Sequence, residues 1–163
     1  MQEFRRRYYS HPSDLFADMR MLVREHRRIR ALRQGRSIDR ALQERLVLAV
    51  TEVNGCRYCA YAHARLALAA GLTKSDVEAF AQGDLGKVPT EQVPALLYAQ
   101  HWAEADGDPD PDLRQRIVET YGSDETAAME LAMRTIRVGN LLGNTTDYLI
   151  YRASFGRWGN RGR

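Results

Sequence analysis

The chain has 163 residues, a formal net charge of +3 and two cysteines. A chain of this length can bury a stable core without cross-links, so the cysteines are not needed as structural disulfides. They lie three positions apart in one motif, unlike the dispersed cysteines of secreted disulfide-rich domains, and we expect a cytoplasmic protein. No apolar run approaches the roughly 20 residues that cross a bilayer, so we expect no membrane span.

Hydrophobic residues recur with helical periodicity, and no segment alternates like a strand. We therefore predict an all-α fold of about seven helices in a single domain spanning 1–163. The first helix is predicted over 13–34 and is followed by Gly35, a favourable residue at a helix C-terminus.

The next two helices are predicted over 37–54 and 56–70, with Ser37 opening the first of them and a turn at Asn54-Gly55 between them. The stretch 46–50 is apolar on every side, which is typical of a buried helix. The second helix of the pair is rich in alanine. Because it begins at Cys56, both cysteines lie at the start of this central helix.

Four further helices complete the predicted fold. In chain order they are a short helix from Thr73 to Gly83, a helix over 90–105, a short helix after the loop 106–111 and a long helix over 124–155. Thr73 and Asp76 have the spacing of a capping box. We expect the tail 156–163 to be loose.

The long C-terminal helix contains two glycines and two asparagines at regular spacing. Gly139 and Gly143 share one edge of it, and Asn140 and Asn144 share the next. Each glycine inside a helix costs about 1 kcal/mol relative to alanine, so something should compensate for it. We favour close helix packing; a polar lining of an active-site pocket and a contact between subunits are the alternatives.

Arginines are concentrated in residues 24–36. Acidic residues downstream nearly cancel this charge, and neither an aromatic-interleaved basic strand nor zinc-finger spacing accompanies it. We therefore interpret the segment as a solvated helix face or a subunit contact, and expect no nucleic-acid partner.

Cys56, Cys59 and His63 form the motif that carries chemical information. Residues three and four apart share one face of a helix, so Cys59 should contact both of the others. The thiolate is the reactive form of cysteine, and both a helix N-terminus and a neighbouring imidazole lower the pKa of a thiol. The spacing therefore predicts a redox-active dithiol with an adjacent base.

Glu44 lies twelve residues before Cys56. If the helices on either side of the turn run antiparallel, their rise of 1.5 Å per residue brings Glu44 level with His63. A carboxylate in an apolar stretch needs a partner, and a histidine that accepts a proton from Cys59 is oriented by one. We predict a proton relay that runs through Glu44, His63, Cys59 and Cys56.

Zinc binding is one alternative. A zinc site would need four ligands, of which the motif supplies three, and Glu44 or His101 could be the fourth. Structural zinc sites take their cysteines from loops rather than from one alanine-rich helix, so we expect neither a metal nor another cofactor. Two inert buried cysteines beside a core histidine are a further alternative.

The relay reads glutamate, eleven residues, cysteine, two residues, cysteine, three residues, histidine. In this it resembles the alkylhydroperoxidase D (AhpD-like) branch of the carboxymuconolactone decarboxylase superfamily, most closely over the motif core 38–83. The resemblance implies an all-helical domain that assembles into trimers or hexamers. It also implies an oxidoreductase that reduces hydroperoxides, with a lipoyl domain, a thioredoxin-like protein or a peroxiredoxin partner as its thiol electron donor.

The resemblance implies a role for each relay residue. Cys59 would react with peroxide and pass through a sulfenic acid, and Cys56 would donate a proton and then form the disulfide. His63 and Glu44 would manage the protons. The helix dipole by itself favours Cys56 as the thiol of lower pKa, but we follow the histidine and the resemblance.

This chain departs from the best-known peroxidase of that family at one position. That enzyme has a second histidine between its cysteines, where this chain has Tyr58. Two other functions stay open: a non-enzymatic redox or metal-binding module, and a decarboxylase of the lactone type, whose chemistry does not call for a thiol pair.

Overall fold

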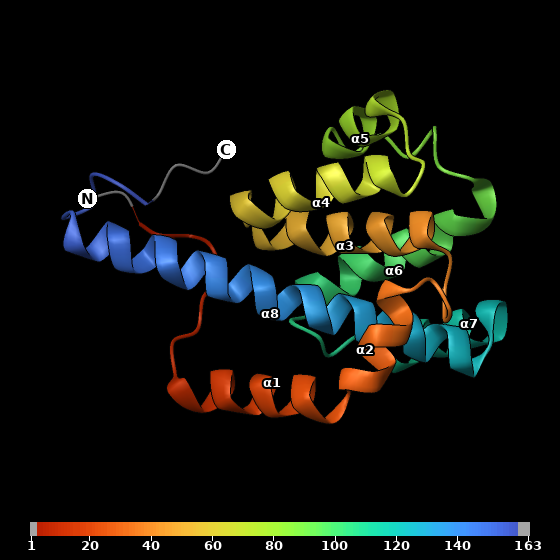
Figure 1. Ribbon diagram of the computed structural model, residues 1–163, viewed down its shortest axis with the longest axis horizontal. Coiled ribbons are helices and arrows are strands. Elements are labelled where there is room, and N and C mark those ends of the chain that lie inside the picture. Colours follow the sequence, from red (N-terminus) through yellow and green to blue (C-terminus); the bar gives the residue numbers. More distant parts are fainter. Residues whose placement is uncertain (1–2, 160–163) are drawn as a thin grey trace.

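The computed structural model describes residues 3–159, without the side chain of Phe80. Within this range it contains helices only, so the predicted all-α fold is confirmed (Figure 1). In chain order they are α1 (Pro12–Arg24), α2 (His26–Arg33), α3 (Arg40–Asn54), α4 (Arg57–Ala69), α5 (Lys74–Ala81), the short 3₁₀ helix η1 (Thr90–Gln92), α6 (Val93–Glu104), α7 (Pro111–Tyr121) and α8 (Ser123–Ala153).

Helix α3 lies at the centre and packs against α4, α6 and α8 (Figure 1). Its stretch 46–50, predicted to be buried, places Leu46, Ala49 and Val50 in the core with no exposed surface. Burying a leucine or valine side chain contributes roughly 1.5–3 kcal/mol, so this helix provides much of the core.

The α3–α4 hairpin has well-defined ends. Helix α3 starts three residues later than predicted, because Asp39 and not Ser37 caps it by accepting a hydrogen bond from the backbone N–H of Leu42 at 2.9 Å. Gly55 ends it with a φ of 68°, a left-handed conformation that glycine adopts without a steric penalty. Cys56 is then the N-cap of α4.

The single helix predicted over 13–34 is wrong, because the chain turns at Glu25 and forms α1 and α2. The turn lets α2 fold onto α8 and bury Leu32, whereas α1 has no buried residue (Figure 1). This division accounts for the difference between seven predicted and eight observed α-helices.

Farther along the chain, the structure agrees with the predictions from local sequence. The predicted capping box closes, because Thr73 N–H donates to Asp76 at 2.8 Å and Asp76 N–H donates back to Thr73 Oγ1 at 3.1 Å. Helix α8 has nearly its predicted length. No helix within residues 3–159 is both long and apolar enough to span a bilayer.

The described part of the tail, 156–159, is held by hydrogen bonds. Trp158 N–H donates to Ser154 Oγ at 2.9 Å, and the carbonyl of Gly159 accepts from Arg6. The prediction of a loose tail therefore does not describe this part, and the remainder, 160–163, lies outside the described residues.

Candidate active site

The two cysteines lie where α3 turns into α4. Their sulfur atoms are 2.7 Å apart and both thiols are free. A disulfide bond is about 2.05 Å long, so only a small movement separates this pair from the oxidised form. Cys56 is 1 % exposed and Cys59 is partly exposed, so the second cysteine is the more accessible of the two.

The surroundings of the two sulfurs separate their pKa values. The pKa of Cys56 is lowered from 9.0 to about 7, above all by the hydrogen bond from the Cys59 thiol and, against the effect of burial, by backbone N–H groups of the first turn of α4. The same hydrogen bond, together with burial, raises the pKa of Cys59. Cys56 therefore ionises first, in agreement with its place at a helix N-terminus.

His63 and Glu44 meet across the α3–α4 pair, as the antiparallel arrangement predicted. The imidazole Nδ1 lies 2.8 Å from Glu44 Oε2, and Glu44 is 2 % exposed. A carboxylate can only accept, so Nδ1 carries the proton and Nε2 of the neutral ring is free to act as a base. Among the described residues no hydrogen bond joins His63 directly to either cysteine.

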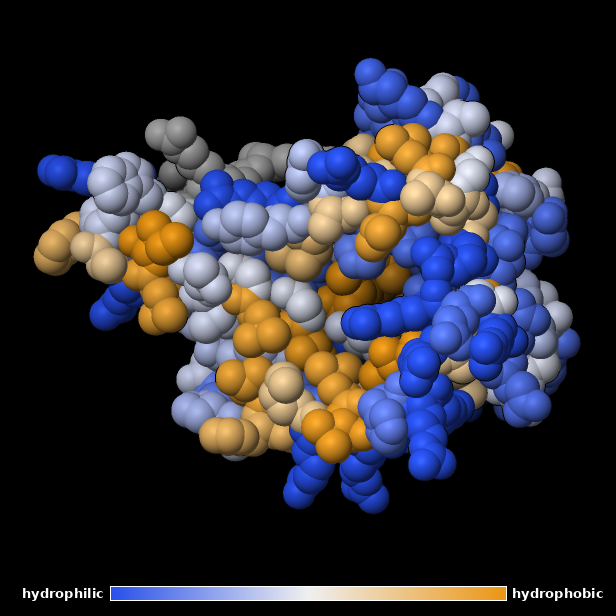
Figure 2. Space-filling view, viewed as in Figure 1, coloured by the Kyte–Doolittle hydropathy of each residue, from blue (hydrophilic) through white to orange (hydrophobic). Residues whose placement is uncertain are grey.

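A cavity of about 480 Å³ opens beside this pair, between α2, α3, α4 and α8. Glu44 and His63 line it together with Gly139. Its apolar wall consists of Ile29, Leu32, Val47, Leu66, Ala132 and Ile136. Figure 2 shows hydrophobic side chains around a hollow between α4 and α8, with hydrophilic side chains at its edge. The volume suits a small organic molecule.

The two glycines of α8 face the two sulfurs. A Cβ atom at Gly139 would lie 3.9 Å from Cys59 Sγ, and one at Gly143 would lie 2.7 Å from Cys56 Sγ. The second distance is too short for a real contact, so the glycine at 143 makes room for Cys56. Close packing thus accounts for Gly143, whereas Gly139 has room for a Cβ atom and lines the cavity.

Asp147 is a buried carboxylate that sequence reasoning missed. It is unexposed and accepts hydrogen bonds from Arg6 at 2.7 Å, Arg57 at 2.7 Å and Tyr58 at 2.9 Å. Burial by itself would raise the pKa of Asp147, but these three bonds outweigh it and lower the pKa. The sequence does contain one indication of its position, because Asp147 lies four residues after Gly143 and therefore on the same helix face.

The two asparagines of α8 are fully buried and bind neighbouring segments. Asn140 Oδ1 accepts from Thr51 in α3 at 3.2 Å. The amide of Asn144 donates to the carbonyls of Asn54 and Arg7 at 2.8 and 2.9 Å. They therefore fasten α8 to the end of α3 and to the N-terminal segment.

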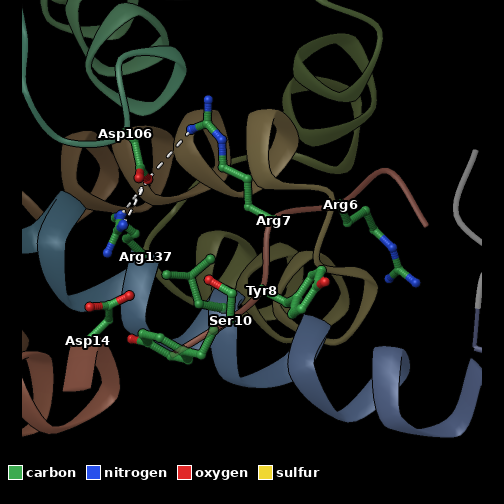
Figure 3. A pocket seen from close by; sticks show the side chains of 9 residues that line it. Arg6, Arg7, Tyr8, Ser10, Asp14, Asp106 and Arg137 are labelled. Atoms are coloured by element: carbon green, nitrogen blue, oxygen red, sulfur yellow. Dashed lines mark hydrogen bonds and ion pairs between the residues drawn. The ribbon is translucent and has the colours of Figure 1, made fainter. Parts of the chain in front are cut away.

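A second cavity, of about 470 Å³, lies between the N-terminal segment and α8 (Figure 3). Its charged side chains already have partners: Arg137 binds Asp106 at 2.8 Å and Asp18 at 3.2 Å, and Arg7 approaches Asp106 to 3.8 Å. No histidine lines it, whereas His63 lines the other cavity and Gly139 in that lining lies beside Cys59. The cavity beside His63 is therefore the better candidate for chemistry.

His101, one of the two candidates for a fourth ligand in the zinc alternative, is engaged elsewhere. Its Nε2 accepts from the backbone N–H of Asp110 at 3.2 Å, at the entrance to α7. Across the described part of the chain no set of three or more histidine, cysteine, aspartate or glutamate side chains is arranged to hold a metal ion.

One comparison with known proteins identifies the family of this chain. The model of the carboxymuconolactone decarboxylase family matches residues 19–105, which is more than half of the chain and contains all four relay residues. Neither a curated protein nor a solved structure gave a match. With this match and an all-helical fold, the chain belongs to the carboxymuconolactone decarboxylase family.

Proposed function

We propose that this protein is a thiol-dependent hydroperoxide reductase of the AhpD-like branch of its family, with Cys59, Cys56, His63 and Glu44 as its reactive residues. The observation that carries the proposal is a free dithiol with sulfurs 2.7 Å apart, next to a histidine–glutamate pair on an apolar cavity. A dithiol that cycles needs a reducing compartment, so the proposal includes a cytoplasmic location.

The proposed first step is attack of the Cys59 thiolate on the outer oxygen of a hydroperoxide. Cys59 is the more exposed residue of the pair and lies beside Gly139, which lines the cavity. The Cys59 proton passes to the Cys56 thiolate over 2.7 Å, which leaves Cys56 protonated. The O–O bond breaks, Cys59 becomes a sulfenic acid, and the alkoxide leaves as the alcohol with the proton of Cys56.

The proposed second step forms the disulfide. The Cys56 thiolate, regenerated by the first step, attacks the sulfur of the Cys59 sulfenic acid and displaces hydroxide. His63, oriented by Glu44, takes up the proton that Cys56 releases when it ionises, and it returns that proton here to turn hydroxide into water. In sum one dithiol and one hydroperoxide give one disulfide, one alcohol and one water. A donor dithiol restores the pair by exchange at the disulfide.

Variants of the two cysteines test this assignment. We expect Cys59→Ser to abolish turnover of cumene hydroperoxide with a dithiol reductant. Cys56→Ser should lose turnover but accumulate one sulfenic acid per chain, trapped by dimedone and located at Cys59 by mass spectrometry. Turnover by Cys59→Ser equal to that of the parent, or a dimedone adduct on Cys56 of the parent, would overturn the assignment.

The physiological donor belongs to one of three proposed classes: a lipoyl domain, a thioredoxin-like protein or a peroxiredoxin partner. Each class can be tested by the rate at which its dithiol reduces the preformed disulfide of Cys56 and Cys59.

Two other functions predict different results. A non-enzymatic redox or metal-binding module would bind zinc in stoichiometric amounts or show thiol oxidation without turnover. A lactone decarboxylase would retain its activity in Cys59→Ser.

We also propose a homo-oligomer, a trimer or a hexamer. Its support is the exposed apolar surface of α1, where Phe16 is 73 % and Val23 69 % exposed and no residue is buried. Apolar side chains gathered on a surface in this way are typical of protein interfaces. Light scattering of the purified protein measures the subunit number.

A further inference from the structure

The cavity beside His63 has a polar end that the proposed peroxide chemistry does not use. Arg40 and Gln43, in the first turn of α3, both line it. Arg40 Nε and Gln43 Oε1 are buried and, among the described residues, have no hydrogen-bond partner. Buried polar groups are rarely left unpaired, so a partner from outside the chain is expected here.

The charge of this end is positive. Arg33 joins Arg40 in the cavity lining, and Arg40 is held by a hydrogen bond to the carbonyl of Arg33. Within residues 3–159 neither arginine is paired with a carboxylate. The only acid in the lining, Glu44, is already bound to His63. An anionic group is therefore the partner that this end favours.

Arg40 and Cys59 lie on opposite sides of the Glu44–His63 pair; Cys59 does not line the cavity itself but lies beside Gly139, which does. Arg40 is one helical turn before Glu44 in α3, and Cys59 is one turn before His63 in the antiparallel α4. Since Glu44 and His63 meet, the positions of Arg40 and Cys59 along the helix axes differ by two turns, which is on the order of 10 Å. The wall of the cavity is apolar. A ligand that matches has a charged head and a hydrocarbon body.

We propose that the cavity binds hydroperoxides of long-chain carboxylic acids, with the carboxylate on Arg40 and Gln43 and the peroxide group at Cys59. The inference rests on the proposed peroxide chemistry and specifies its substrate. The Gln43 amide turns its N–H group toward the carboxylate, because amide orientation follows the hydrogen bonds that are available. Arg40 and Gln43 are thus specificity-determining residues, and Cys59 remains the reacting one.

Turnover of linoleic acid hydroperoxide and of its methyl ester tests the proposal. The ester keeps the peroxide and the hydrocarbon chain and removes only the charge. We expect kcat/KM for the acid to exceed that for the ester by about tenfold or more, as a charge-assisted hydrogen bond provides. Arg40→Gln should bring this ratio close to one. The matched control, Arg30→Gln, removes an exposed arginine of α2 that does not line the cavity and should preserve the ratio.

A binding measurement separates this inference from the peroxide chemistry. Calorimetry of the reduced parent with linoleic acid and methyl linoleate, which carry no peroxide, should give about tenfold tighter binding of the acid. Gln43→Glu should weaken binding of the acid more than that of the ester, since it places a second negative charge beside the carboxylate. A folded Gln43→Glu, checked by circular dichroism, also serves if Arg40→Gln does not fold.

The outcomes can be told apart. Equal affinity for acid and ester in the parent overturns the proposed carboxylate site, even if neutral hydroperoxides are turned over. Selective binding of the acid that Arg40→Gln abolishes supports the site, even if no hydroperoxide is reduced and the proposed function fails. Selectivity that persists in both Arg40→Gln and Gln43→Glu assigns the carboxylate to other residues and also overturns the proposal.

Discussion

Two buried carboxylates flank the cysteine pair, and their surroundings differ. Asp147 is enclosed by Arg6, Arg57 and Tyr58, all of which donate to it. Glu44 has one partner among the described residues, the imidazole of His63, and lies on the wall of a cavity. A carboxylate whose acceptor sites are filled by fixed donors stabilises structure, whereas one that orients a single titratable ring beside open space can take part in proton transfer.

Replacing Glu44 should have the largest effect on activity. Glu44→Gln keeps the shape of the side chain but removes the negative charge beside His63, so we expect kcat/KM for cumene hydroperoxide to fall about 100-fold or more. The midpoint of thermal unfolding should change little. Steady-state rates and calorimetry measure the two effects. Activity within a few-fold of the parent would remove Glu44 from the mechanism.

Replacing Asp147 should have the opposite pattern. Asp147→Asn leaves Arg6 without its buried counter-ion, so we expect the free energy of unfolding to fall by roughly 3 kcal/mol in urea titrations. Activity per folded chain should stay within a few-fold. Asp106→Asn is the matched control, because this carboxylate is 56 % exposed in its ion pair with Arg137 and should contribute less than about 1 kcal/mol. Equal losses in the free energy of unfolding for Asp147→Asn and Asp106→Asn would contradict a structural role that is specific to Asp147.

Replacing Gly139 or Gly143 with alanine tests how closely α8 packs against each of the two sulfurs. Gly143→Ala places a methyl group 2.7 Å from Cys56 Sγ, so we expect a destabilisation of about 1–2 kcal/mol. Gly139→Ala meets Cys59 at an ordinary 3.9 Å, so the gain in helix propensity should make it neutral or stabilising by up to about 1 kcal/mol. Chemical unfolding of both variants is the measurement, and the reverse order of stabilities would show that the cysteines pack differently.

The smallest expected effect is a shift in one titration. Because the pKa of Cys56 is lowered to about 7, its alkylation rate should rise with pH and reach half of its maximum near pH 7. Below that pH the thiolate is protonated and the rate falls. Cys59→Ser keeps a hydrogen-bond donor and should leave this midpoint near 7, whereas Cys59→Ala should move it upward. An unchanged midpoint in Cys59→Ala would mean that the helix N-terminus alone sets the pKa.

The contact between Glu44 and His63 could be predicted because both residues lie within one helical hairpin. The distance from Glu44 to His63 is fixed by helix rise and by the turn at Gly55, and both follow from local sequence. The ionisation order of the cysteines was the exception. The N-cap position and the bond between the thiols favour Cys56, whereas the sequence interpretation followed His63.

Features that depend on contacts between distant segments could not be predicted. The partners of Asp147 include Arg6, 141 positions away, and nothing in the local pattern of either residue joins them. The break at Glu25 has the same origin, because continuing α1 in a straight line would carry Leu32 away from α8. Local patterns specified these helices in part, but their ends and neighbours depended on tertiary packing.

The packing of α8 against the cysteines limits how this chain could be shortened. A fragment cut to the family match, 19–105, would keep all four relay residues. It would lose the whole of α8, including the glycines beside the sulfurs and Asp147, and it would also lose Arg6. The cysteine motif is contiguous in sequence, but its sulfurs pack against α8, and Asp147 of α8 is bound by Arg6 from the N-terminal segment, so we expect a fragment that contains the motif alone to lose this packing.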